Sequence, residues 1–171
     1  MLKMAGAVLI IAGTTAWGAC SVMKMRGRVR SLNALVWALK LMGEEICANL
    51  TPMPEVMALV GSAAPKPAAE LFAKARDKLE NLGSASFCEL WRQAVDETPS
   101  LLLENDEREI LVRLGGELGK YDFESQGRII RSAVKRLELK AEKAERERAA
   151  NSRLHAFLGI AAGMFAVVVL I

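Results

Sequence analysis

The chain has 171 residues, the size of one small domain, of which 52% are hydrophobic and 25% charged. Its net charge is +3. Without Lys3 and the four cations at positions 24–30, 18 cations and 20 acids remain, a net charge of −2. This balance argues against nucleic-acid binding. Cys20, Cys47 and Cys88 lack metal-ligand spacing and are expected to be reduced thiols. The single histidine, His155, lies beside the second apolar run, so the polar part of the chain has no histidine for a Ser–His–Asp triad.

An uncharged apolar segment occupies the N-terminus. Ala5 to Met23 is a run of nineteen residues without a charge. As a helix this run would be about 29 Å long, close to the hydrocarbon core of a bilayer, roughly 30 Å. We therefore expect a transmembrane helix over residues 1–23. The alternative is a cleaved signal peptide with lipidation at Cys20, but Trp17 at the −3 position and the length of the run argue against it.

The central segments predict helices and no strand. Apolar residues recur every three or four positions from 28 to 46, so the first helix is expected to continue from the membrane segment to about Asn49. Thr51 is expected to cap a short second helix, with Pro52 at its first position. Three more helices are expected over about 65–83, 84–97 and 104–118.

A sixth helix is expected to open near Phe123, with no breaker before a second uncharged run, Ala156 to Ile171. Opposite charges four residues apart, such as Lys143 and Glu147, are typical of a solvated helix. We expect this helix to run beside the first as a stalk into the membrane; a partner-binding coiled coil is the alternative.

The predicted fold class is therefore all-α. Roughly six helices form a bundle over residues 24–153, and a second transmembrane helix covers residues 154–171, whose sixteen uncharged residues would span about 24 Å.

Cations flank both apolar runs on the side of the central domain, whereas only Lys3 lies outside. The positive-inside rule therefore places the domain in the cytoplasm and both termini across the membrane. These cations could also contact anionic lipid headgroups. The membrane-flanking cations are Lys24, Arg26, Arg28, Arg30 and Arg153.

No pattern of residues predicts catalysis. The run from Gly115 to Lys120 is superficially like a phosphate-binding loop, but it lacks the spacing and the following Ser or Thr, and glycines are expected where a helix ends. We expect no enzyme activity, no cofactor and no metal site.

Several short motifs occur in order along the chain. They are Glu45-Ile46, Thr51-Pro52-Met53-Pro54-Glu55, Trp91, Leu114-Gly115, Leu118-Gly119, Asp122, Gln126, Leu158-Gly159 and Gly163. Taken together, these motifs resemble the stage III sporulation protein AB family. In that family Tyr-Gly often stands where this chain has Ala48 and Asn49, and asparagine tolerates the left-handed conformation that a helix end can require.

The resemblance implies a non-enzymatic scaffold of the channel between mother cell and forespore, in the mother-cell membrane of an endospore-forming bacterium. It also implies a soluble domain similar to the inner-membrane platform protein of type II secretion systems. The implied partners are other channel-complex membrane proteins, a cytoplasmic secretion-type ATPase and membrane lipids, with homo-oligomerisation left open and no nucleic acid.

Four polar residues of these motifs, Glu45, Glu55, Asp122 and Gln126, are candidates for one partner-binding surface. Thr51 and Pro52 are explained as a helix start, and Glu55 also suits the first turn of a helix. Two other functions stay open: a platform component of another type II secretion or type IV pilus machine, and an exported lipoprotein that acts as a binding module.

Overall fold

A computed structural model describes the backbone of residues 2–79, 85–118 and 123–170, and the side chains of 22–79, 85–118 and 124–151. Within these ranges the chain is all-α, with no strand. Its elements are α1 (Leu2–Cys47), α2 (Met53–Ala63), α3 (Ala68–Leu79), α4 (Phe87–Asp96), the 3₁₀ turn η1 (Pro99–Leu101), α5 (Asn105–Glu117) and α6 (Phe123–Leu170).

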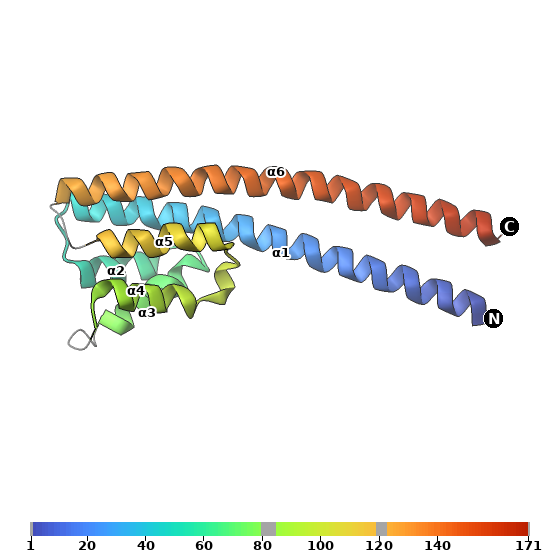
Figure 1. Ribbon diagram of the computed structural model, residues 1–171, viewed down its shortest axis with the longest axis horizontal. Coiled ribbons are helices and arrows are strands. Elements are labelled where there is room, and N and C mark those ends of the chain that lie inside the picture. Colours follow the sequence, from blue (N-terminus) through green and yellow to red (C-terminus); the bar gives the residue numbers. More distant parts are fainter. Residues whose placement is uncertain (1, 80–84, 119–122, 171) are drawn as a thin grey trace.

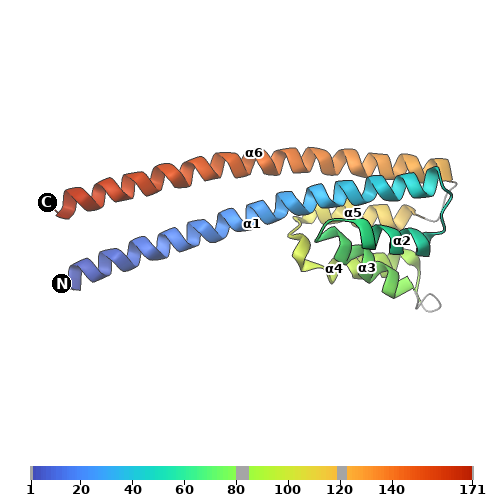
Figure 2. The same ribbon diagram turned by 180° about the vertical axis from the view of Figure 1, so that it is seen from behind.

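Two long helices set the shape of the molecule. The antiparallel α1 and α6 lie side by side, and α2 to α5 pack against only one half of them (Figures 1 and 2). We call this half the head. The other half, residues 2–27 and 148–170, projects beyond it as a stalk, with both termini at its end. The predicted bundle, the order of its helices and the pairing of the first helix with the last are confirmed.

The head is held together by the apolar stripes expected from the sequence. Leu32, Leu35, Leu39 and Met42 of α1 are completely buried, and α6 contributes Ile130 and Leu137 with the smaller Ala133, Ala141 and Ala144. Burying one leucine side chain stabilises a fold by about 1.5–3 kcal/mol, so this seam accounts for much of the pairing of α1 with α6. Small residues let the two helices approach closely.

An aromatic cluster joins three of the four short helices, α3, α4 and α5. Trp91 of α4 packs edge-on against Phe72 of α3, with ring centroids 5.6 Å apart, and stacks with Phe87 at 6.1 Å. Its indole nitrogen donates a hydrogen bond to the carbonyl of Leu111 in α5, 2.8 Å away. Gly115 follows one turn later, and a Cβ there would lie 2.1 Å from Trp91 Cδ1. Only glycine at 115 leaves room for the indole in this position.

The start of α2 corrects one prediction. Pro52, not Thr51, is the N-cap residue, with an extended backbone and no side-chain cap, and Pro54 lies in the first turn. Thr51 lies one residue before the N-cap, and its hydroxyl donates a hydrogen bond to Glu45 of α1. The left-handed residue is likewise not Asn49 but Leu50, whose φ is 52° and whose side chain is 55% exposed.

The two predicted transmembrane segments, 1–23 and 154–171, lie almost entirely outside the residues whose side chains are described. Their backbone is helical from Leu2 and as far as Leu170, continuous with the head helices. In the described residues, no helix combines the length and the apolar character that crossing a membrane requires.

Candidate interaction surface

The turn between α1 and α2 is closed by Glu45. Its Oε2 accepts hydrogen bonds from Asn49 Nδ2 and from the Thr51 hydroxyl, each at 3.0 Å, and its backbone carbonyl accepts from the Thr51 amide at 3.1 Å. The carboxylate is half-buried and is occupied by the turn that it stabilises. This bonding explains why glutamate, threonine and proline occur together at this spacing.

The four candidate residues do not form one exposed polar surface. Glu45, Glu55 and Gln126 do lie at the end of the head farthest from the termini, where α1 ends and α2 and α6 begin (Figure 1). However, Gln126 is only 8% exposed, so the expectation that it faces a partner is wrong. Glu55 is exposed, and Asp122 lies outside the described residues.

A largely buried arginine marks the junction of head and stalk. The side chain of Arg28 in α1 is 14% exposed, and its guanidinium contacts Glu107 at 2.5 Å, Glu104 at 2.5 Å and Glu147 of α6 at 3.4 Å. Glu107, on α5, is completely buried and also accepts a hydrogen bond from the Glu104 amide at 2.9 Å. One cation thereby joins three helices.

The electrostatics of this junction keep Arg28 charged. Burial alone would lower the pKa of its guanidinium, but the hydrogen bond and charge of Glu107, with Glu104 and Glu147, raise it above its ordinary value. Arg28 was expected to flank the membrane; instead it is an internal ion-pair residue. Lys24, Arg26 and Arg30 are exposed, and the side chain of Arg153 is outside the described residues.

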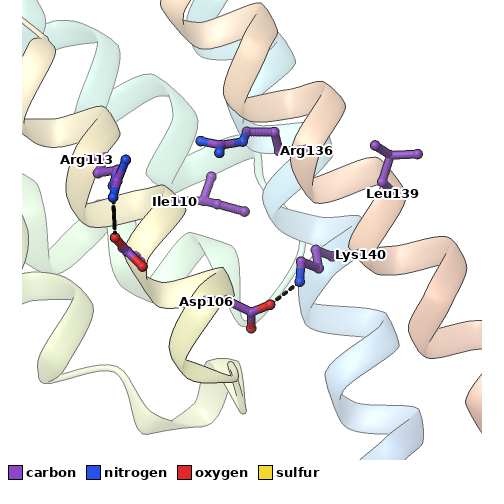
Figure 3. A pocket seen from close by; sticks show the side chains of 7 residues that line it. Asp106, Ile110, Arg113, Arg136, Leu139 and Lys140 are labelled. Atoms are coloured by element: carbon purple, nitrogen blue, oxygen red, sulfur yellow. Dashed lines mark hydrogen bonds and ion pairs between the residues drawn. The ribbon is translucent and has the colours of Figure 1, made fainter.

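A groove separates α5 from α6 on the outside of the head (Figure 3). It consists of two hollows of about 350 and 320 Å³ that share Ile110, Arg113 and Arg136. Arg136 reaches from α6 toward Ile110 of α5, and Asp106 and Lys140 form an ion pair across one end. Further apolar lining comes from Leu114, Ile129, Ala133 and Leu139.

Cations predominate in the part of α6 that borders this groove. Residues 125–137 contain four cations and no acid, whereas residues 138–151 contain four of each. All four cations are exposed; Arg128 and Arg136 line the groove, whereas Arg131 and Lys135 lie outside its lining. We call Arg128, Arg131, Lys135 and Arg136 the basic strip.

The charges of the basic strip are largely unmatched. Arg128 pairs with Glu124, but Arg131, Lys135 and Arg136 form no ion pair with any residue that the structure describes. In the following half of α6, Lys143, Arg146 and Arg148 pair with Glu147, Glu142 and Glu145. The sequence analysis missed this strip, although the run of cations without an acid was visible in it.

In the described ranges, no three or more His, Cys, Asp or Glu side chains are placed to hold a metal ion. The groove is shallow, with an apolar floor and a charged rim, as protein-binding surfaces commonly are.

Comparison with known proteins identifies the family. The model of the stage III sporulation protein AB family matches residues 3–171. The chain belongs to the stage III sporulation protein AB family. It is 31% identical over 172 residues to stage III sporulation protein AB of Bacillus subtilis (strain 168), covering 99% of both chains. A solved structure of a stage III sporulation protein AB superposes with a TM-score of 0.65 at 28% identity, covering 72% of this chain and 98% of the other.

Four of the motif residues that resemble the family have structural roles in this chain. Glu45, Thr51 and Pro52 build the α1–α2 turn, and Gly115 accommodates Trp91. The family membership makes the protein a sporulation-related one with an all-α head.

Proposed function

We propose that this chain is a non-enzymatic scaffold of the mother cell–forespore channel, anchored in the mother-cell membrane by both ends. One observation supports this most directly: the two uncharged apolar runs belong to the two long helices of the stalk and end at the same side of the head (Figure 2). A single bilayer could therefore take both ends, with the head standing off the membrane.

The proposed topology puts the head in the cytoplasm. The exposed Lys24, Arg26 and Arg30 follow the first apolar run on the head side, where the positive-inside rule places cytoplasmic cations. By the resemblance to secretion platform proteins, the head would contact a cytoplasmic ATPase of the secretion type together with the other membrane proteins of the channel. This step rests on analogy of fold.

Topology mapping with single cysteines tests the proposal. Lys3→Cys, Arg76→Cys and Lys143→Cys are placed one at a time in a full chain whose own cysteines are replaced by serine. An impermeant thiol reagent applied to intact mother cells should label position 3 only. Arg76 and Lys143 are 47% and 66% exposed, so both should label once the cells are opened. Labelling of 76 and 143 from outside would show an exported head and overturn the proposal.

A further inference from the structure

The α5–α6 groove and its basic strip place apolar side chains next to exposed cations. The groove offers apolar side chains, including Leu139, which is 60% exposed. Three exposed cations of the strip have no ion pair among the residues described: Arg136, which lines the groove, and Arg131 and Lys135, which lie outside its lining. An exposed leucine lowers the solubility of the protein, and neighbouring cations without ion pairs repel one another. A partner that is both apolar and acidic would cover the leucine and neutralise the cations.

We propose that this groove binds an acidic amphipathic helix of a partner protein. The two hollows share residues and follow the space between two helices, so together they form an elongated seat of the kind into which a third helix lays its apolar face. Carboxylates on the flanks of that helix would meet Arg128 and Arg136, which line the groove from α6. Among the carboxylates that line the groove, Asp106 pairs with Lys140, Glu109 pairs with Arg113, and Glu117 forms no ion pair with either arginine in the described residues. Arg128 pairs with Glu124 outside the lining, so Arg136 is the lining cation that a partner carboxylate would newly pair.

The orientation of the strip favours a protein over an anionic bilayer. The strip lies along α6, and therefore along the axis of the stalk, so it faces sideways rather than toward the apolar ends (Figure 1). A membrane at the end of the stalk would meet Lys24, Arg26 and Arg30 instead. The inference rests on the proposed function only in that the partner must reach the head from the cytoplasm.

The test uses the full chain in a non-ionic detergent and a fluorescent 18-residue synthetic helix made of leucine, alanine and glutamate. We expect saturable binding that weakens as salt is raised, and little binding of the same peptide with lysine in place of glutamate. The variant Arg128→Glu/Arg136→Glu should bind about tenfold or more weakly. The matched control, Arg76→Glu/Arg92→Glu, has the same change in net charge on exposed residues of α3 and α4 and should bind within about twofold of the parent chain.

Three outcomes would overturn the inference. One is the absence of saturable binding, and another is an equal loss in both double variants, which would indicate non-specific charge attraction. The third is an unchanged affinity in Leu139→Ser, since the apolar face would then not sit in the groove. Binding of vesicles of phosphatidylcholine and phosphatidylglycerol that is lost in Arg128→Glu/Arg136→Glu, without any peptide binding, would assign the strip to lipid.

A cell experiment separates this inference from the proposed function. If deletion of the gene leaves spore formation intact, the proposed function fails, whatever the peptide does. If deletion blocks spore formation, Arg76→Glu/Arg92→Glu should restore it, and Arg128→Glu/Arg136→Glu should not at an equal protein level. Restoration by both would overturn the groove as a functional docking site while leaving the scaffold role untouched.

Discussion

At the scale of single residues, the space around a glycine decides whether a larger side chain can replace it. The two adjacent glycines of α5 differ sharply: a Cβ at 115 would collide with the Trp91 ring, whereas a Cβ at 116 would have Cys88 Sγ at an ordinary 3.5 Å. The two positions therefore separate the effect of packing from the effect of helix propensity.

Gly115→Ala is expected to destabilise the protein by about 2–3 kcal/mol, since the indole and its hydrogen bond to Leu111 must move. Gly116→Ala should be neutral or stabilising by up to about 1 kcal/mol, because alanine favours the helix. Denaturant unfolding of the two variants measures both values. Equal effects at 115 and 116 would contradict the packing described for Trp91.

The capping box of α4 makes a prediction about pH. Ser86 donates from its amide (2.9 Å) and its hydroxyl (3.0 Å) to Glu89 Oε2, and these bonds lower the pKa of that carboxyl below its usual 4.5. The contribution of the Glu89 carboxylate to the stability of the fold is therefore present above about pH 4.5 and is lost as the pH falls through the lowered pKa. The difference in melting temperature between the parent chain and Glu89→Ala should be largest above pH 5 and shrink in acid. Gln93→Ala, which removes no titrating group, should give a difference that stays constant.

At the scale of helices, the junction of α1, α5 and α6 depends on one largely buried cation. Glu107 is fully buried, so its charge is tolerable only because Arg28 lies against it. The same glutamate fixes the first turn of α5 by accepting from the Glu104 amide. The start of α5 and its attachment to the stalk therefore depend on the same pair.

Arg28→Met should cost about 3–5 kcal/mol in free energy of unfolding, because it leaves the Glu107 carboxylate buried without its partner. Arg30→Met, an exposed position on the same helix, should stay within about 0.5 kcal/mol of the parent chain. The double variant Arg28→Met/Glu107→Met should recover part of the loss. Chemical denaturation measures all three; a cost at Arg28 no larger than at Arg30 would show that the pair is not needed.

At the scale of the whole molecule, the head is separable from the ends of the stalk. The buried core extends from Ser31 to Ala144 and includes no described residue of the stalk. The match to the solved structure spans 98% of that structure's chain but only 72% of this one. A folded unit shorter than the whole chain is consistent with this.

A chain of residues 24–151 should therefore fold by itself. It should be helical by circular dichroism and unfold cooperatively on heating, because it keeps the whole described core and all three partners of Arg28. Residues 32–151, which lack Arg28, should be markedly less stable. Aggregation or non-cooperative melting of residues 24–151 would mean that the ends of the stalk contribute to folding.

Helical periodicity and breakers were sufficient to predict the all-α class, the order of the helices and the inward faces of α1 and α6. These are local properties: an apolar residue every three or four positions must be buried, and proline or glycine interrupts the pattern. Similarity to a family likewise follows from the residues themselves.

Only the tertiary structure decided which charges are internal. In the sequence Arg28 is one of four similar cations, and its burial follows from α5 and α6 bringing three glutamates to it. In the same way, packing buried Gln126, and the Thr51 hydroxyl binds Glu45 of α1 while Pro52 is the N-cap of α2. Whether a polar side chain faces a partner, a turn or the core depends on residues distant in the chain, and helical spacing contains no information about those.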